Sequence, residues 1–142
     1  MKALHLRGFG GPEVLEVVDV PAPGPPHGDE ILVRVHAAGV NRADILQRRG
    51  HYPAPAGSPA DILGMEFGGE ISAVGDDVRA LRVGDRVMGI VGGGAQAEFV
   101  LTTERLVMHV PDAVTNIEAG GIPEAYITAH DALFTIGSPS LG

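Results

Sequence analysis

Residues 30–50, Glu-Ile-Leu-Val-Arg-Val-His-Ala-Ala-Gly-Val-Asn-Arg-Ala-Asp-Ile-Leu-Gln-Arg-Arg-Gly, carry the clearest structural signal in the chain. Apolar residues occupy alternate positions at the start of this stretch, at Ile31, Val33, Val35 and Ala37. This period of two predicts a β-strand over residues 30–40. Asn41 follows as the expected N-cap of a short helix that ends near Arg49, with Gly50 as the glycine just after it.

The rest of the first 110 residues shows the same short strands with glycine-rich punctuation. We expect strands over residues 2–6, 14–20, 68–74, 86–91, 96–101 and 106–110. Residues 21–26, Pro-Ala-Pro-Gly-Pro-Pro, predict a stiff extended loop. Many short strands separated by turns indicate a barrel-like or sandwich-like β domain.

The pattern changes at residues 115–118, Thr-Asn-Ile-Glu, which form a capping box and predict the start of a helix. Pro123 is expected to interrupt that helix, and residues 124–135 predict a second one. Residues 137–142 have the composition of a turn-rich tail.

Composition narrows the class of protein. The 142 residues suffice for one domain or one domain plus a stub, and 44% of them are hydrophobic. The absence of cysteine excludes disulfides and a thiolate zinc site within this sequence. A net charge of −8 argues against nucleic acid or an anionic membrane surface as a partner. With neither a signal-peptide pattern nor an apolar run of membrane-spanning length in this sequence, we expect a cytoplasmic protein.

Six motifs in order carry a family resemblance. They are Gly-Gly-Pro-Glu-Val-Leu at 10–15, Asn-Arg-Ala-Asp at 41–44, Gln-Arg-Arg-Gly-His-Tyr-Pro at 47–53, Gly-Asp-Arg-Val-Met at 84–88, Gly-Gly-Gly-Ala-Gln-Ala-Glu at 92–98 and Ile-Pro-Glu-Ala-Tyr-Ile-Thr-Ala at 122–129. Together they resemble the zinc-free medium-chain dehydrogenase/reductases. The similarity is to NADPH:quinone oxidoreductases of the zeta-crystallin type, especially the stress-inducible subgroup.

The resemblance implies a mainly β fold, a GroES-like β barrel with short helices. It implies a catalytic domain over residues 1–123, followed by a crossover helix and stub over 124–142 that lead to a nucleotide-binding domain. No Gly-x-Gly-x-x-Gly lies between a predicted strand and helix in this sequence. We therefore expect an N-terminal fragment that is truncated before the Rossmann domain and inactive by itself.

The parent protein would transfer hydride from NADPH to a quinone. Two alternatives stay open: an enoyl or alkenal reductase that acts on activated alkenes, and a non-catalytic binding or scaffold module with the same fold. The resemblance also implies a homodimeric parent, whereas the fragment could be a monomer.

The absence of a metal follows from two positions. Zinc-dependent relatives carry cysteine where Asn41 stands and histidine where Met65 stands, and neither replacement is a strong zinc ligand. The six histidines show no metal-binding spacing. We expect no metal site, with hydrogen-bond donors taking over the role of the cation.

The resemblance then assigns candidate site residues. Asn41 and Tyr52 are the catalytic candidates, because an amide and a phenol can donate hydrogen bonds and the phenol can also donate a proton. The cofactor-binding candidates are Asn41, Asp44 and Thr128. The substrate-cleft candidates are Tyr52, Met65 and Gln96.

Most of the candidates also have a structural explanation. Tyr52 could be an ordinary loop anchor, and Thr128 could hydrogen-bond the backbone of its own helix four residues back. Asn41 and Asp44 are spaced to form a reciprocal helix cap. Met65 is suited to fill a gap in the core. Glu66, beside it, resembles the acid next to the ligand histidine of the zinc enzymes, and it could equally be a buried partner of Arg42 or Arg49.

Overall fold

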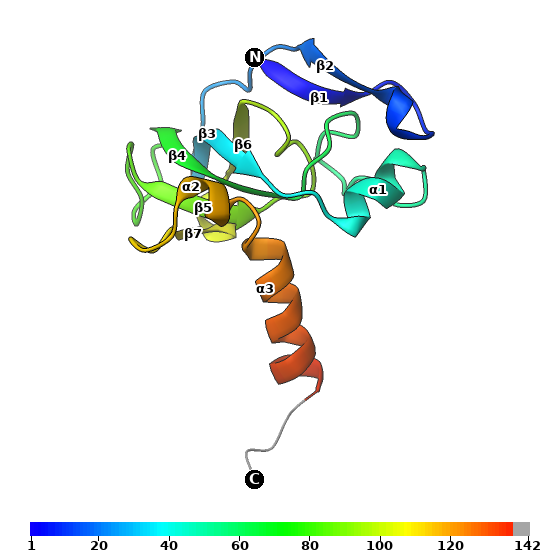
Figure 1. The fold of residues 1–142 in the computed structure, drawn as a ribbon. Coiled ribbons are helices and arrows are strands. Elements are labelled where there is room, and N and C mark those ends of the chain that lie inside the picture. Colours follow the sequence, from blue (N-terminus) through cyan, green and yellow to red (C-terminus); the bar gives the residue numbers. More distant parts are fainter. Residues whose placement is uncertain (138–142) are drawn as a thin grey trace.

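The computed structural model describes residues 1–137 (Figure 1). Of the tail predicted at 137–142, residues 138–142 lie outside the described residues. The elements in chain order are β1 (Lys2–Leu6), η1 (Pro12–Val14), β2 (Leu15–Asp19), β3 (Glu30–Ala38), α1 (Arg42–Arg48), β4 (Glu66–Val74), β5 (Arg86–Ile90), β6 (Phe99–Thr103), η2 (Glu104–Leu106), β7 (Val107–His109), α2 (Asn116–Ala119), α3 (Pro123–His130) and η3 (Asp131–Ile136). The expected mainly β fold with short helices is confirmed.

A five-stranded antiparallel sheet in the order β6-β3-β4-β5-β7 forms the body of the molecule. The predicted strand at residues 30–40 is its β3, which pairs with β6 on one side and β4 on the other. The alternation read from the sequence matches the burial, because Ile31 and Val33 are fully buried and Arg34, the next residue of β3, is exposed. These side chains pack with others from the sheet and the loop after β5: Phe67, Ile71, Val87, Val91, Ala95 and Val100.

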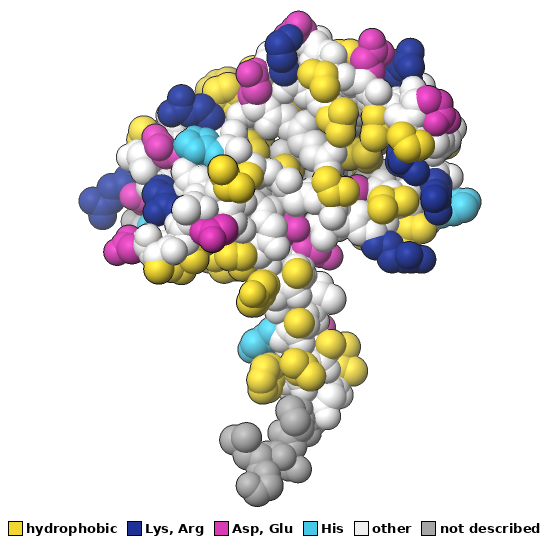
Figure 2. Space-filling model, viewed as in Figure 1, with side chains coloured by type: hydrophobic (Ala, Val, Ile, Leu, Met, Phe, Trp, Pro, Cys, Tyr) yellow, Lys and Arg dark blue, Asp and Glu magenta, His cyan; other side chains and the backbone are white. Residues whose placement is uncertain are grey.

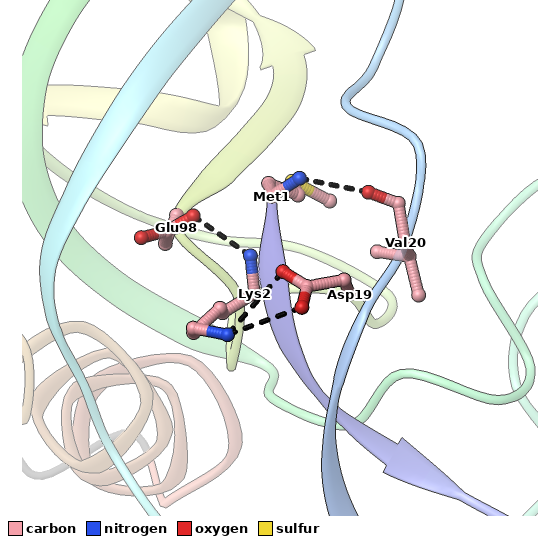
Figure 3. A network of polar contacts seen from close by, with 5 residues as sticks. All are labelled: Met1, Lys2, Asp19, Val20 and Glu98. Carbon is pink, nitrogen blue, oxygen red and sulfur yellow. Dashed lines mark hydrogen bonds and ion pairs between the residues drawn. The ribbon is translucent and has the colours of Figure 1, made fainter.

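The hairpin of β1 and β2 forms a separate two-stranded sheet that attaches to the segment before β6. Figure 3 shows the attachment. The backbone N–H of Lys2 donates to Glu98 Oε2 at 2.7 Å, and the Lys2 ammonium lies 3.2 Å from Asp19 Oδ2. The N-terminal ammonium of Met1 donates to the carbonyl of Val20 at 2.8 Å.

This attachment explains one error of the sequence prediction. A strand was expected over residues 96–101, but β6 begins only at Phe99. The backbone N–H of Gln96 donates to the carbonyl of Leu63, and its carbonyl accepts from the N–H of Leu4. Gln96 and Ala97 therefore pair with β1 and the loop before β4, and the paired register of β3 with β6 begins at Phe99.

The C-terminal helices differ from the prediction in length. The helix that starts at the Thr115 capping box ends at Ala119, before Pro123 is reached. A Cβ on Gly120 would collide with Ala37 of β3, so the chain turns where glycine permits close packing. The second predicted helix, at 124–135, is α3 followed by the π-helical η3.

α3 and η3 project away from the sheet (Figure 1), and apolar side chains cover much of their surface (Figure 2). The large exposed apolar residues on this segment are Tyr126, Ile127, Leu133, Phe134 and Ile136. Within residues 1–137, the structure contains no helix with the length and apolar character that crossing a membrane requires.

Candidate functional site

Asp44 fixes the start of α1 beside the loop that leads into β4. Its side chain is only 2% exposed. Asp44 Oδ2 accepts a hydrogen bond from the backbone N–H of Asn41 at 2.7 Å, and Oδ1 accepts one from the backbone N–H of Gly64 at 3.0 Å. The predicted cap between Asn41 and Asp44 is therefore present, and the same carboxylate ties two distant segments together.

Burial raises the pKa of the Asp44 carboxyl above its ordinary value, because the charged form loses water. The hydrogen bonds from Asn41 and Gly64 act in the opposite direction, and the nearby charge of Glu66 raises the pKa further. Since both carboxylate oxygens are already hydrogen-bonded inside the protein, Asp44 is well placed to hold α1 and poorly placed to reach a ligand.

Asn41 and Glu66 form the second part of the site. The Asn41 side-chain nitrogen donates to Glu66 Oε1 at 2.8 Å. The other oxygen of Glu66, Oε2, accepts from the backbone N–H of Glu124 at 2.9 Å, in the first turn of α3. Glu66 is 3% exposed, so this buried carboxylate connects the loop before α1, the start of β4 and the start of α3.

Neither arginine proposed from the sequence as a partner of Glu66 is its partner. Among residues 1–137, no ion pair with Arg42 or Arg49 involves Glu66. The sequence signal that could have found the second contact is Pro123 at the first position of α3, which predicts a helix start with free backbone N–H groups.

Two glycines make room for this arrangement. A Cβ on Gly39 would overlap Glu66 Oε1. A Cβ on Gly64 would overlap the backbone nitrogen of Gln96, and the φ of Gly64, +105°, disfavours any other residue. The side-chain amide of Gln96 donates to the carbonyl of Gly39 at 3.3 Å. Gln96 therefore lies where the loop before α1 meets the loop before β4, a region that we call the junction.

A small apolar cavity of about 120 Å³ adjoins this junction. Asp44 and Gln96 line it together with apolar side chains such as Val40 and Leu63. Of the candidates predicted from the sequence, the structure thus brings together Asn41, Asp44 and Gln96.

The other candidates lie differently. Met65 is 8% exposed and belongs to the core, as its structural explanation predicted. Thr128 is exposed on α3 and lines a shallow depression of about 460 Å³ with Glu124 and Ile127. Tyr52 is half-buried in the loop after α1. Among the described residues, no side-chain hydrogen bond connects Tyr52 or Thr128 to Asn41.

No three histidine, aspartate or glutamate side chains within residues 1–137 are grouped as a metal site would require. The zinc-free character inferred from Asn41 and Met65 stays a prediction.

Comparison with known proteins identifies the family. Residues 27–112 match the model of the alcohol dehydrogenase GroES-like domain, and the chain belongs to this family. It aligns with the N-terminal part of medium-chain quinone oxidoreductases, as the sequence motifs predicted.

Three relatives illustrate the similarity. The chain is 37% identical to mouse synaptic vesicle membrane protein VAT-1 homolog-like over 138 residues, which are 97% of this chain and 33% of the relative. It is 40% identical to the quinone oxidoreductase of Pseudomonas aeruginosa over 122 residues, which are 85% of this chain and 37% of that enzyme. The structure superposes with a TM-score of 0.85 on the Escherichia coli quinone oxidoreductase complexed with NADPH, at 30% identity over 94% of this chain and 40% of that one. The chain thus spans roughly a third to two fifths of the length of these proteins.

Proposed function

We propose that the chain forms the substrate-side domain of an NADPH-dependent quinone oxidoreductase that works without zinc. The observation that carries the proposal is the held amide of Asn41. By the family resemblance Asn41 stands where zinc-dependent relatives place a metal ligand. Glu66 accepts a hydrogen bond from the Asn41 side-chain amide, and Asp44 accepts one from the Asn41 backbone N–H.

The roles follow from what each side chain can donate. An amide nitrogen has two N–H bonds, and Glu66 takes one of them. The other can donate to the acceptor oxygen, on which negative charge develops during reduction. We assign Tyr52 to proton delivery, since a phenol close to the acceptor can release a proton. We also assign Gln96, and Met65 through its 8% exposed surface, to the wall around the acceptor.

NADPH, when bound, supplies the hydride. The uncharged groups of Asn41 and Thr128 are suited to the nicotinamide end of the cofactor. The buried, doubly hydrogen-bonded Asp44 is assigned to holding Asn41 in place. The net charge of −8 makes this domain a poor host for the cofactor phosphates.

The exposed apolar surface of α3 and η3 supports the assignment of phosphate binding to another part of the protein. Five large apolar side chains are exposed on one projecting segment, and exposed apolar surface gathered in one place is typical of an interaction site. A following nucleotide-binding domain would cover them. We therefore expect the 142 residues by themselves to turn over little or nothing.

The test is to express the complete reading frame that contains this chain and to measure NADPH oxidation with a quinone and with an alkenal. Quinone-dependent oxidation that falls about 100-fold or more in Asn41→Ala supports the proposal. If the alkenal is turned over faster than the quinone, the protein is an alkenal reductase instead. A second test is calorimetry with NADPH on the 142 residues. Micromolar binding would contradict the assignment of phosphate binding to another part of the protein.

A non-catalytic module is the second candidate. The observation that favours it is the 37% identity to a VAT-1 homolog-like protein, whose name states no reaction. A full-length protein that binds NADPH yet reduces neither acceptor would establish it in place of the reductase.

A further inference from the structure

Glu66 is a buried carboxylate with no cationic partner among the described residues. It is the first residue of β4 and is 3% exposed. Its charge is met instead by two hydrogen bonds, one to each oxygen, from the Asn41 side chain and from the Glu124 backbone. Because an ionised carboxylate can only accept hydrogen bonds, both groups that contact it must act as donors.

We propose that Glu66 is a positioning residue that orients the Asn41 amide and couples it to the position of α3. The proposal rests on the role of Asn41 in the proposed function. An asparagine amide can be turned by half a rotation, which exchanges its oxygen and nitrogen. An ionised carboxylate accepts only, so Glu66 Oε1 selects the orientation in which the nitrogen faces it.

The capping-box arrangement selects the same orientation from the other end. There the Asn41 side-chain oxygen faces the backbone N–H of Asp44 at the start of α1. With one N–H donated to Glu66, the amide keeps its second N–H as the group it can offer to an acceptor oxygen. Without Glu66, the amide could present its oxygen instead, which would repel a developing oxyanion.

The second oxygen of Glu66 makes this orientation depend on α3. The Glu124 N–H belongs to the first turn of the helix, where backbone N–H groups have no partner within the helix. The absence of a side chain at Gly39 lets the carboxylate lie between the two donors. A displacement of α3 would therefore pull on the same carboxylate that aligns Asn41.

The first experiment uses the 142-residue chain and needs no activity. Glu66→Gln keeps the shape of the side chain but offers one accepting oxygen to two donors. Glu70→Gln is the matched control, because Glu70 lies on the same strand and makes only a 3.8 Å ion pair with Arg34.

In Glu66→Gln, we expect a changed NMR shift of the Asn41 side-chain amide or hydrogen exchange at the Glu124 N–H that is about tenfold faster or more. Glu70→Gln should show neither change. If both Asn41 and Glu124 signals stay as in the wild type, or if the control changes them equally, the proposal is wrong. Should Glu66→Gln not fold, Asn41→Ala decides: removal of one of the two donors to Glu66 should change hydrogen exchange at the Glu124 N–H, and unchanged exchange there would refute the coupling.

The second experiment uses the full-length protein. Glu66→Gln should lower kcat for the quinone about tenfold or more, and the double variant with Asn41→Ala should be no slower than Asn41→Ala within about twofold. If the reductions of kcat from the two substitutions multiply in the double variant, Glu66 does not act through Asn41. If the full-length protein does not reduce the quinone, the proposed function is wrong. The NMR experiment still tests separately whether Glu66 orients Asn41 and couples it to α3.

Discussion

Asp44→Ala tests how much the hydrogen bonds of Asp44 contribute to the free energy of unfolding. The substitution removes a 2% exposed carboxylate and leaves the backbone N–H groups of Asn41 and Gly64 buried without acceptors. Each unsatisfied donor costs about 1–3 kcal/mol, so the two together cost about 2–6 kcal/mol. Burial of the charged carboxylate, which raises its pKa, offsets part of this cost. We therefore expect a loss of about 2–4 kcal/mol in the free energy of unfolding at pH 7.

The measurement is urea unfolding followed by circular dichroism, with the slope compared between variants. Asp19→Ala is the control, because the Asp19 side chain is 79% exposed and its ion pair with Lys2 should contribute less than about 1 kcal/mol. A change of under about 0.5 kcal/mol in Asp44→Ala, or one no larger than in the control, would refute the assignment of Asp44 as the tie between α1 and the loop before β4.

The raised pKa of Asp44 gives the same prediction a pH dependence. The folded state binds the Asp44 proton more tightly than the unfolded state does. This contribution to stability is complete below about pH 3.9, the unfolded value, and is lost as the pH rises through the folded-state pKa. Asp44→Asn lacks this titration, so its stability relative to wild type should improve as the pH rises over that range. A difference that is constant with pH would contradict the shift.

Three further predictions concern the surrounding structure. Gly64→Ala forces an unfavourable φ and an overlap with the Gln96 backbone, so thermal unfolding should show a loss of at least about 1–3 kcal/mol; an unchanged melting temperature would contradict it. Asn116→Ala removes the oxygen that accepts a hydrogen bond from Arg86 Nε at 2.7 Å, so we expect faster hydrogen exchange in α2. Asn116→Asp keeps an acceptor and should retain the protection of the wild type. Hydrogen bonds from the capping box lower the pKa of Glu118, so its stabilising contribution is present above about pH 4.3 and is lost as the pH falls through the lower folded-state value. Urea midpoints of Glu118→Gln should therefore depend less on pH in this range than those of wild type.

The β fold was predictable because its signal is local. Alternation of apolar residues around Ile31 and Val33, glycines in the turns and the cap at Asn41 each depend on neighbours along the chain. The errors arose where a distant segment competes for the backbone. Gln96 was assigned to a strand, yet its N–H and carbonyl bind Leu63 and Leu4.

The site was predictable only in part. Asn41 and Gln96 were identified from the family resemblance, and both lie at the junction. For Glu66, an arginine partner was one of two equal alternatives, because a buried acid often pairs with a basic residue. Its actual partners are an amide 25 positions away and a backbone N–H 58 positions away, and no sequence pattern states such a pairing.

The sequence by itself determined the family, the strand-rich class, the helix caps at Asn41 and Thr115 and the residue types available for the chemistry, since all of these follow from identity and short-range spacing. Only the tertiary structure decided which donors meet the oxygens of Asp44 and Glu66. That choice depends on how β4 and α3 pack around Gly39, where a missing side chain allows a buried charge to lie between two hydrogen-bond donors.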